Sequence, residues 1–174
     1  VPCPGDKPAA PATGPAPAPA AVVVEPGTVM YGVKGLGGIG DTDAFKDFAT
    51  ARGYTPVMID TWDPDEATRK IAAAVKKTSA PYALYGFSLG AKIVRDFAAE
   101  NGDNPPTLVV TVGASSVVPM EGKFNSKTMV EHYFHTNTKH DVEGVFIKAP
   151  HTGDGNIQRV IADEAKSKAK PKLD

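Results

Sequence analysis

The chain of 174 residues has little of several features that would place it in a specialised class. Its one cysteine, Cys3, excludes an internal disulfide and cannot form a metal site alone. With 19 Lys and Arg against 20 Asp and Glu, the net charge is −1, so we expect no general electrostatic attraction of the chain to nucleic acid. No apolar run is long enough to span a bilayer. Aromatic residues make up 7%, so no large lipid-binding surface is indicated.

Proline is concentrated at the N-terminus, where residues 1–20 hold seven of the 16 prolines. Such a segment cannot form regular helix or ladder hydrogen bonds, which predicts a Pro/Ala-rich arm or linker that could tether a domain. One domain is predicted over residues 21–174, and its lysine-rich tail is interpreted as a solvated helix end. A chain that begins with Val1 fits export after removal of a leader or a cytoplasmic fragment, and the sequence leaves both open.

Apolar, β-prone stretches alternate with amphipathic stretches of helical length through this domain. Strands are predicted over residues 28–33, 54–59, 82–85, 107–112, 131–136 and 144–148. Helices are predicted from an N-cap at Asp41 or Thr42 to about residue 52, and over 64–77, 89–100 and 157–167. This alternation predicts an α/β protein, a three-layer α/β/α sandwich with a mostly parallel sheet. Ligands of such sheets bind at the carboxyl ends of the strands.

The segment Gly86-Phe87-Ser88-Leu89-Gly90 fits the pattern Gly-x-Ser-x-Gly between a predicted strand and a predicted helix. A serine on a very tight strand-to-helix turn is exposed at the edge of the sheet, and small flanking residues let strand and helix approach. The N–H of Leu89, at the start of the helix, can then donate to a developing oxyanion. We therefore predict that Ser88 is a nucleophile, against the simpler interpretation of an ordinary Gly/Ser turn.

Another glycine-rich turn, residues 35–40, follows the first predicted strand. Its Leu36 N–H is the predicted second oxyanion donor, with Gly37 N–H as the next candidate. The same turn matches the dinucleotide-binding pattern Gly-x-Gly-x-x-Gly through Gly35, Gly37 and Gly40, and Asp60 lies where a ribose-binding acid would be. A Rossmann-like dinucleotide-binding domain is thus the chief alternative.

Four histidines are candidates for a general base. His132 and His135 lie in or beside a predicted strand and are interpreted as structural, and His140 lies in a polar loop where a solvated position is expected. His151 follows the last predicted strand, on the side of the sheet where Ser88 should be, and is the predicted base. Asp141 is the predicted acid, and Asp154 is the alternative, although it could instead cap the last helix. The order Ser88, Asp141, His151 is the order expected of α/β hydrolases.

Over residues 28–165 these motifs resemble the α/β-hydrolase superfamily. Residues 86–90 resemble its nucleophile elbow, and Lys34-Gly35-Leu36-Gly37-Gly38 is similar to its His-Gly-x-Gly-Gly loop, with Lys34 in place of the usual histidine. The small size and the close spacing of Asp141 and His151 are similar to lidless cutinases and minimal lipases, although cutinases typically carry disulfides. The resemblance implies a serine esterase, lipase or thioesterase that acts through an acyl-enzyme on a small-molecule ester, with no cofactor or metal.

A third possibility is a non-catalytic module of hydrolase fold, which the N-terminal arm would attach to a larger assembly. The motifs do not exclude it, because a triad can be present and still be blocked.

Overall fold

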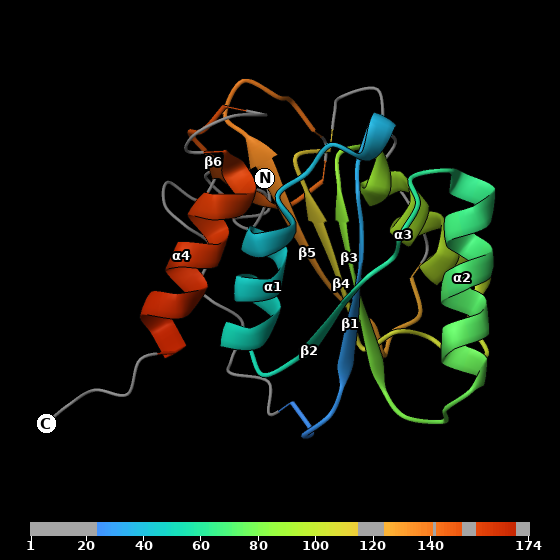
Figure 1. The fold of residues 1–174 in the computed structure, drawn as a ribbon. Helices are drawn as coiled ribbons and strands as arrows, with labels where there is room; N and C mark the ends of the chain where they lie inside the picture. Colours follow the sequence, from blue (N-terminus) through green and yellow to red (C-terminus); the bar gives the residue numbers. More distant parts are fainter. Residues whose placement is uncertain (1–23, 115–123, 141, 151–155, 170–174) are drawn as a thin grey trace, which may run out of the picture.

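The structure is a computed structural model that describes residues 24–114, 124–140, 142–150 and 156–169. Along these residues strands and helices alternate (Figure 1). The strands are β1 (Val29–Val33), β2 (Thr55–Met58), β3 (Tyr82–Phe87), β4 (Leu108–Val112), β5 (Met129–His135) and β6 (Val145–Ile147). The helices are α1 (Thr42–Ala51), α2 (Pro64–Lys76), α3 (Leu89–Glu100) and α4 (Ile157–Ala169), and a short 3-10 turn, η1 (Leu36–Gly38), follows β1. The predicted elements are confirmed, whereas the predicted arm lies outside the described residues.

The strands form one sheet in the order β2-β1-β3-β4-β5-β6, and every neighbouring pair is parallel. The carboxyl ends of all six strands therefore lie at one edge of the sheet. The chain crosses to the other side of β1 between β2 and β3, so the turns that follow β1 and β3 leave neighbouring strands. In open sheets of this kind, such a switch point is where a ligand binds.

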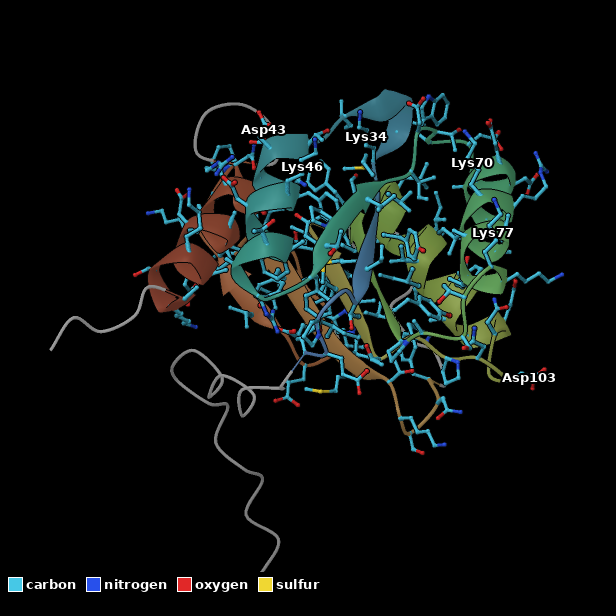
Figure 2. The ribbon with its side chains drawn as sticks, turned by 60° about the horizontal axis from the view of Figure 1, so that its bottom comes forward. Lys34, Asp43, Lys46, Lys70, Lys77 and Asp103 are labelled. Carbon is cyan, nitrogen blue, oxygen red and sulfur yellow. The ribbon has the colours of Figure 1, made fainter. Side chains whose placement is uncertain are left out.

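Helices cover both faces of the sheet, which confirms the predicted three layers (Figure 1). Helices α1 and α4 pack together on one face and α2 and α3 on the other. Successive residues of β3 alternate between the layers: Tyr85 joins the core under α1 and α4, and Leu84 joins the core under α2 and α3. Lys46 on α1 and Lys70 and Lys77 on and beside α2 lie on the outer side of their helices (Figure 2).

Local signals in the sequence define where the helices begin. The Asp41 carboxylate accepts a hydrogen bond from Ala44 N at 2.8 Å, and the Asp63 carboxylate accepts one from Glu66 N at 2.9 Å. Each carboxylate satisfies an N–H that has no partner within its helix. Pro64 occupies the first turn of α2, where its missing N–H costs nothing. In the described parts of the chain no helix has the length and apolarity needed to cross a membrane.

Candidate active site

Ser88 lies between β3 and α3 in a strained backbone conformation. Its φ is 56° and its ψ is −116°, and it is the one non-glycine residue with positive φ among those described. Such a conformation costs on the order of 1–2 kcal/mol in an L-residue and persists only where the surroundings impose it. Ser88 N donates to Val112 O at 2.9 Å, so the turn is fastened to the end of β4.

Gly86 and Gly90 make this turn possible because the backbone leaves no space for a side chain at either position. A Cβ on Gly86 would overlap the carbonyl oxygen of Gly90, in the first turn of α3. A Cβ on Gly90 would overlap the carbonyl oxygen of Val33, at the end of β1. Both glycines are therefore required by close backbone approach, as expected for a sharp strand-to-helix turn.

The turn after β1 lies against the serine. A Cβ on Gly35 would be 3.0 Å from Ser88 Cβ and 3.3 Å from Phe87 O, so the two turns touch at this point. Within the first turn, Gly35 N donates to Ile39 O, Gly38 N to Gly35 O and Ile39 N to Leu36 O. These bonds do not use the N–H of Leu36. The structure thus brings the segment with Leu36 next to Ser88, and Leu89 begins α3 directly after it.

The contacts at the start of α1 disfavour the dinucleotide-binding alternative. In that motif the glycine turn opens a helix whose N-terminal amides bind a pyrophosphate. Here the Asp41 carboxylate occupies the N-terminus of α1, and Gln158 Oε1 accepts from Asp41 N at 2.8 Å. The strand order also differs from that of the dinucleotide fold, in which β1 lies between β2 and β4, because here β1 lies between β2 and β3. Asp60 is exposed at the end of β2.

Gln158 joins three elements near the site, and it is not among the residues that the sequence predicted for the site. Its side chain is buried, with 2% exposed; Oε1 binds Asp41 N, and Nε2 donates to Tyr85 Oη at 3.0 Å. This fixes the start of α4 against α1 and against β3. Burial also raises the pKa of Tyr85, so its hydroxyl stays neutral. The sequence signal that could have indicated Gln158 is the presence of a glutamine on the apolar face of the last helix.

Three of the four histidines are described, and each has a defined partner. His132 Nδ1 shares a 2.6 Å hydrogen bond with Thr111 Oγ1, and burial, with a smaller effect of His140, lowers its pKa to about 4. His135 Nδ1 donates to Ala149 O at 2.7 Å. Both lie on β5 with these partners, in line with a structural role. His140 differs from the expectation of a solvated ring: it is half-buried, stacks on Phe134 at 4.0 Å and donates from Nε2 to Ala114 O at 3.3 Å.

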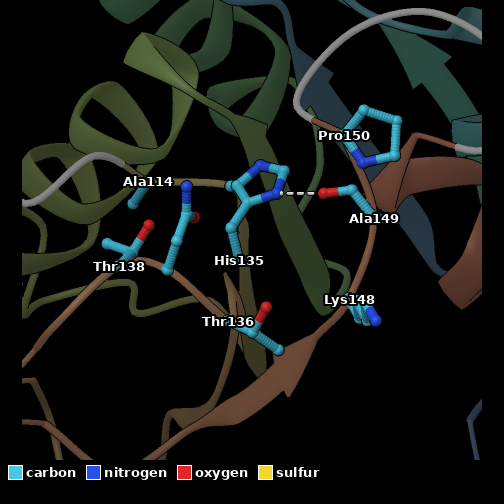
Figure 3. A pocket seen from close by; sticks show the side chains of 9 residues that line it. Ala114, His135, Thr136, Thr138, Lys148, Ala149 and Pro150 are labelled. Atoms are coloured by element: carbon cyan, nitrogen blue, oxygen red, sulfur yellow. Dashed lines mark hydrogen bonds between the residues drawn. The ribbon is translucent and has the colours of Figure 1, made fainter.

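A pocket opens at the carboxyl ends of β4, β5 and β6 (Figure 3). His135 and Ala149 form its wall together with residues that follow the three strands, namely Gly113, Ala114, Thr136, Asn137, Thr138, Lys148 and Pro150. Ser88 is not among the residues that line it. The pocket nevertheless lies at the edge of the sheet where Ser88 lies, because β4 pairs with both β3 and β5. Among the described residues no group of histidine, cysteine and acidic side chains could hold a metal ion.

The predicted base and acid, His151 and Asp141, lie outside the described residues, as does the alternative acid Asp154. The structure therefore leaves their geometry relative to Ser88 as a prediction. The strands that precede Asp141 and His151 are described: β5 ends at His135 and β6 at Ile147, at the edge of the sheet that holds Ser88.

The sequence matches no family model, and a search of curated proteins finds no match. Solved structures do match. A protein of the alpha/beta hydrolase superfamily from Xanthomonas campestris pv. campestris aligns over 80% of this chain and 98% of its own, with a TM-score of 0.54 and 12% identity. A cutinase-like protein from Cryptococcus sp. aligns over 80% of this chain and 91% of its own, with a TM-score of 0.53 and 16% identity.

A monoacylglycerol lipase from Paleococcus ferrophilus also matches, at 20% identity and a TM-score of 0.40. The match covers 53% of this chain and 42% of the lipase, so this chain spans less than half of that protein. At these identities a structural likeness concerns the fold, and the first two matches align over most of both chains. Together with the parallel sheet, its strand order and the turn at Ser88, they establish that this chain has the α/β-hydrolase fold.

Proposed function

We propose that the protein is a serine hydrolase that cleaves carboxylic or thio esters through an acyl-enzyme. The observation that carries the proposal is the backbone of Ser88, held at φ 56° by two glycines that have no space for a side chain. Strain of this kind is costly and is characteristic of functional positions. An ordinary Gly/Ser turn would need neither the strain nor the close approach of α3 to β1.

Ser88 Oγ would attack the carbonyl carbon of the ester, and the carbonyl oxygen would become an oxyanion. The N–H groups of Leu89 and Leu36 are the proposed donors to it. Leu89 begins α3, where N–H groups have no partner within the helix and the helix dipole favours negative charge. Leu36 belongs to the turn that touches Ser88 through Gly35, and the bonds of that turn leave its N–H unused.

His151 would take the proton of Ser88 and transfer it to the leaving alcohol or thiol, and Asp141 would orient its ring. Water activated by the same histidine would then release the acid. This assignment is supported by the described neighbours of the two residues, since the chain reaches both from strand ends at the edge that holds Ser88. The three described histidines are engaged in other contacts, which favours His151 over them.

A fluorophosphonate probe tests the nucleophile. We expect the folded protein to be labelled, Ser88→Ala to remain unlabelled, and Ser126→Ala, which alters an exposed serine on a distant turn, to label like the wild type. Equal labelling of Ser88→Ala, or no labelling of the wild type, would overturn the proposal. Turnover of p-nitrophenyl acetate that disappears in Ser88→Ala would also exclude a purely structural module.

Substitutions at the base and acid test the rest of the triad. His151→Ala should lower kcat by about three orders of magnitude, whereas His140→Ala should change it little. Comparison of Asp141→Asn with Asp154→Asn identifies the acid, because loss of the orienting carboxylate should lower kcat much more than loss of a helix cap.

A further inference from the structure

Exposed large apolar side chains gather in the turn beside Ser88 and in the turn next to it, after β2. Among the described residues six such side chains are exposed, on Leu36, Ile39, Val57, Trp62, Met129 and Phe146. Three of them lie in the turns that follow β1 and β2: Leu36 is 60% exposed, Ile39 41% and Trp62 42%. We call these three side chains the apolar shelf. Exposed apolar groups next to a candidate active site indicate a surface that binds something apolar.

The apolar shelf adjoins Ser88 through the first glycine turn. The position of a Cβ on Gly35 is 3.0 Å from Ser88 Cβ and 3.2 Å from Ile39 Cγ1, so Ile39 and Ser88 flank the same glycine. The position of a Cβ on Gly38 is 3.9 Å from Trp62 Cδ1. Trp62 therefore lies against the turn that carries Leu36 and Ile39, at the carboxyl edge of the sheet, where η1 lies in Figure 1.

The position of Trp62 is fixed by the start of α2. Asp63, the next residue, caps the helix by accepting from Glu66 N at 2.9 Å. Thr61, on its other side, accepts from Asp63 N at 3.1 Å and donates to Glu66 Oε2 at 3.2 Å. An indole held half-exposed between two such contacts is a preformed surface, and binding an alkyl chain there requires little ordering of the loop.

We propose that the apolar shelf binds the acyl chain of the ester substrate, which makes the protein selective for medium-length acyl chains. The inference rests on the proposed function, because it places the acyl chain relative to an ester carbonyl at Ser88. Three side chains can cover one side of a chain of several methylenes. An anionic lipid surface is disfavoured as the occupant, because the acids Asp60, Asp63 and Asp65 stand on both sides of Trp62 in the sequence.

A series of p-nitrophenyl esters from acetate to octanoate tests the selectivity, with each ester kept below the concentration at which it aggregates. Complete burial of a methylene improves binding about fourfold, so a shelf that covers one side should raise kcat/KM about twofold per methylene. The wild type should therefore prefer octanoate to acetate by tenfold or more. Trp62→Ser and Ile39→Ser should reduce this ratio severalfold. Met129→Ser, which alters an exposed apolar residue at the opposite edge of the sheet, should preserve it.

The fluorescence of Trp62, the one tryptophan of the chain, gives a readout that does not depend on catalysis. In Ser88→Ala, octanoate should shift its emission to shorter wavelength in a saturable way, and acetate should not. If Ser88 is labelled and turns over esters but neither the ratio nor the fluorescence depends on chain length, the shelf proposal alone fails. If the fluorescence responds but Ser88 is neither labelled nor active, the proposed function fails, and with it the role of the shelf in binding a substrate.

Discussion

Two glycine-rich turns meet at the candidate site, and their glycines are there for different reasons. In the turn after β3, Gly86 and Gly90 lack a Cβ because neighbouring backbone atoms occupy its place. In the turn after β1, Gly37 has a φ of 70° and nothing within 4 Å of the position of a Cβ, so its requirement is conformational. Gly35 has an ordinary φ of −79° and resembles Gly86 and Gly90, because a Cβ on it would lie 3.0 Å from Ser88 Cβ.

This difference separates the parts of the site that build the fold from those that shape its surface. In the turn after β3, a side chain at Gly86 or Gly90 would push α3 away from β1 or deform β3, and the core would lose contacts. A side chain at Gly37 would point into open space and cost only local strain. The comparison therefore predicts a graded series of effects.

Gly90→Ala should have the largest effect, since its Cβ would overlap the Val33 carbonyl and neither backbone can move without repacking the sheet. We expect a loss of about 3 kcal/mol in the free energy of unfolding and no activity. Chemical denaturation measures the first and ester turnover the second. Gly102→Ala is the matched control, because its Cβ meets nothing within 4 Å. Equal stability of the two variants would contradict the close approach of α3 to β1.

Gln158→Leu should have the next largest effect, because Gln158 fastens the end of the first turn to the strand that leads into the second. Burying the Tyr85 hydroxyl and Asp41 N–H without partners should cost about 2 kcal/mol of unfolding free energy. In a double-mutant cycle measured by denaturation, Tyr85→Phe should lessen the cost of Gln158→Leu, since the hydroxyl that lost its partner is then absent. Additive effects would show that the bond between the two side chains contributes little.

Gly37→Ala should cost about 1 kcal/mol, the strain of a left-handed conformation in alanine. Gly27→Ala is the control for this strain, because Gly27 has a φ of 85° and open space around it but precedes β1 at the other edge of the sheet. The two variants should lose similar stability by thermal denaturation, whereas only Gly37→Ala should lower kcat/KM. If Gly27→Ala lowered kcat/KM as much as Gly37→Ala, the effect could not be attributed to the position of the turn after β1 beside Ser88.

Ser88→Gly should have the smallest effect on stability, and of opposite sign. Glycine relieves the strain at φ 56° but adds entropy to the unfolded chain, so we expect a net gain of about 0.5 kcal/mol. Ser88→Ala keeps a Cβ and should show no gain, and both variants should be inactive. A stability loss in Ser88→Gly, measured by denaturation, would mean that the serine side chain supports the turn instead of being strained by it.

Local signals predicted the elements well because the physics that creates them is local. Asp63 followed by Pro64 begins α2 as predicted, and the glycines around Ser88 mark the turn that the structure contains. Two features that the sequence did not predict depend on contacts in the folded chain. The partner of Gln158 is 73 residues away at Tyr85, and His140 stacks on Phe134 instead of lying in solvent. Such contacts depend on which strands become neighbours, and no short pattern in the chain specifies that.

The sequence by itself determined the alternation of strands and helices, the helix caps and the candidate nucleophile, since each follows from residues a few positions apart. Only the tertiary structure shows what surrounds the glycine turn after β1, and these surroundings disfavour the dinucleotide-binding interpretation. The residues of this turn are compatible with a pyrophosphate or an oxyanion, and the choice depends on what lies next to them. The order of the strands brings Gly35 against Ser88, and the packing of α4 brings Gln158 to Asp41 N at the start of α1. Long-range packing thus places the turn beside the serine, because contacts between residues distant in the sequence decide which groups become neighbours.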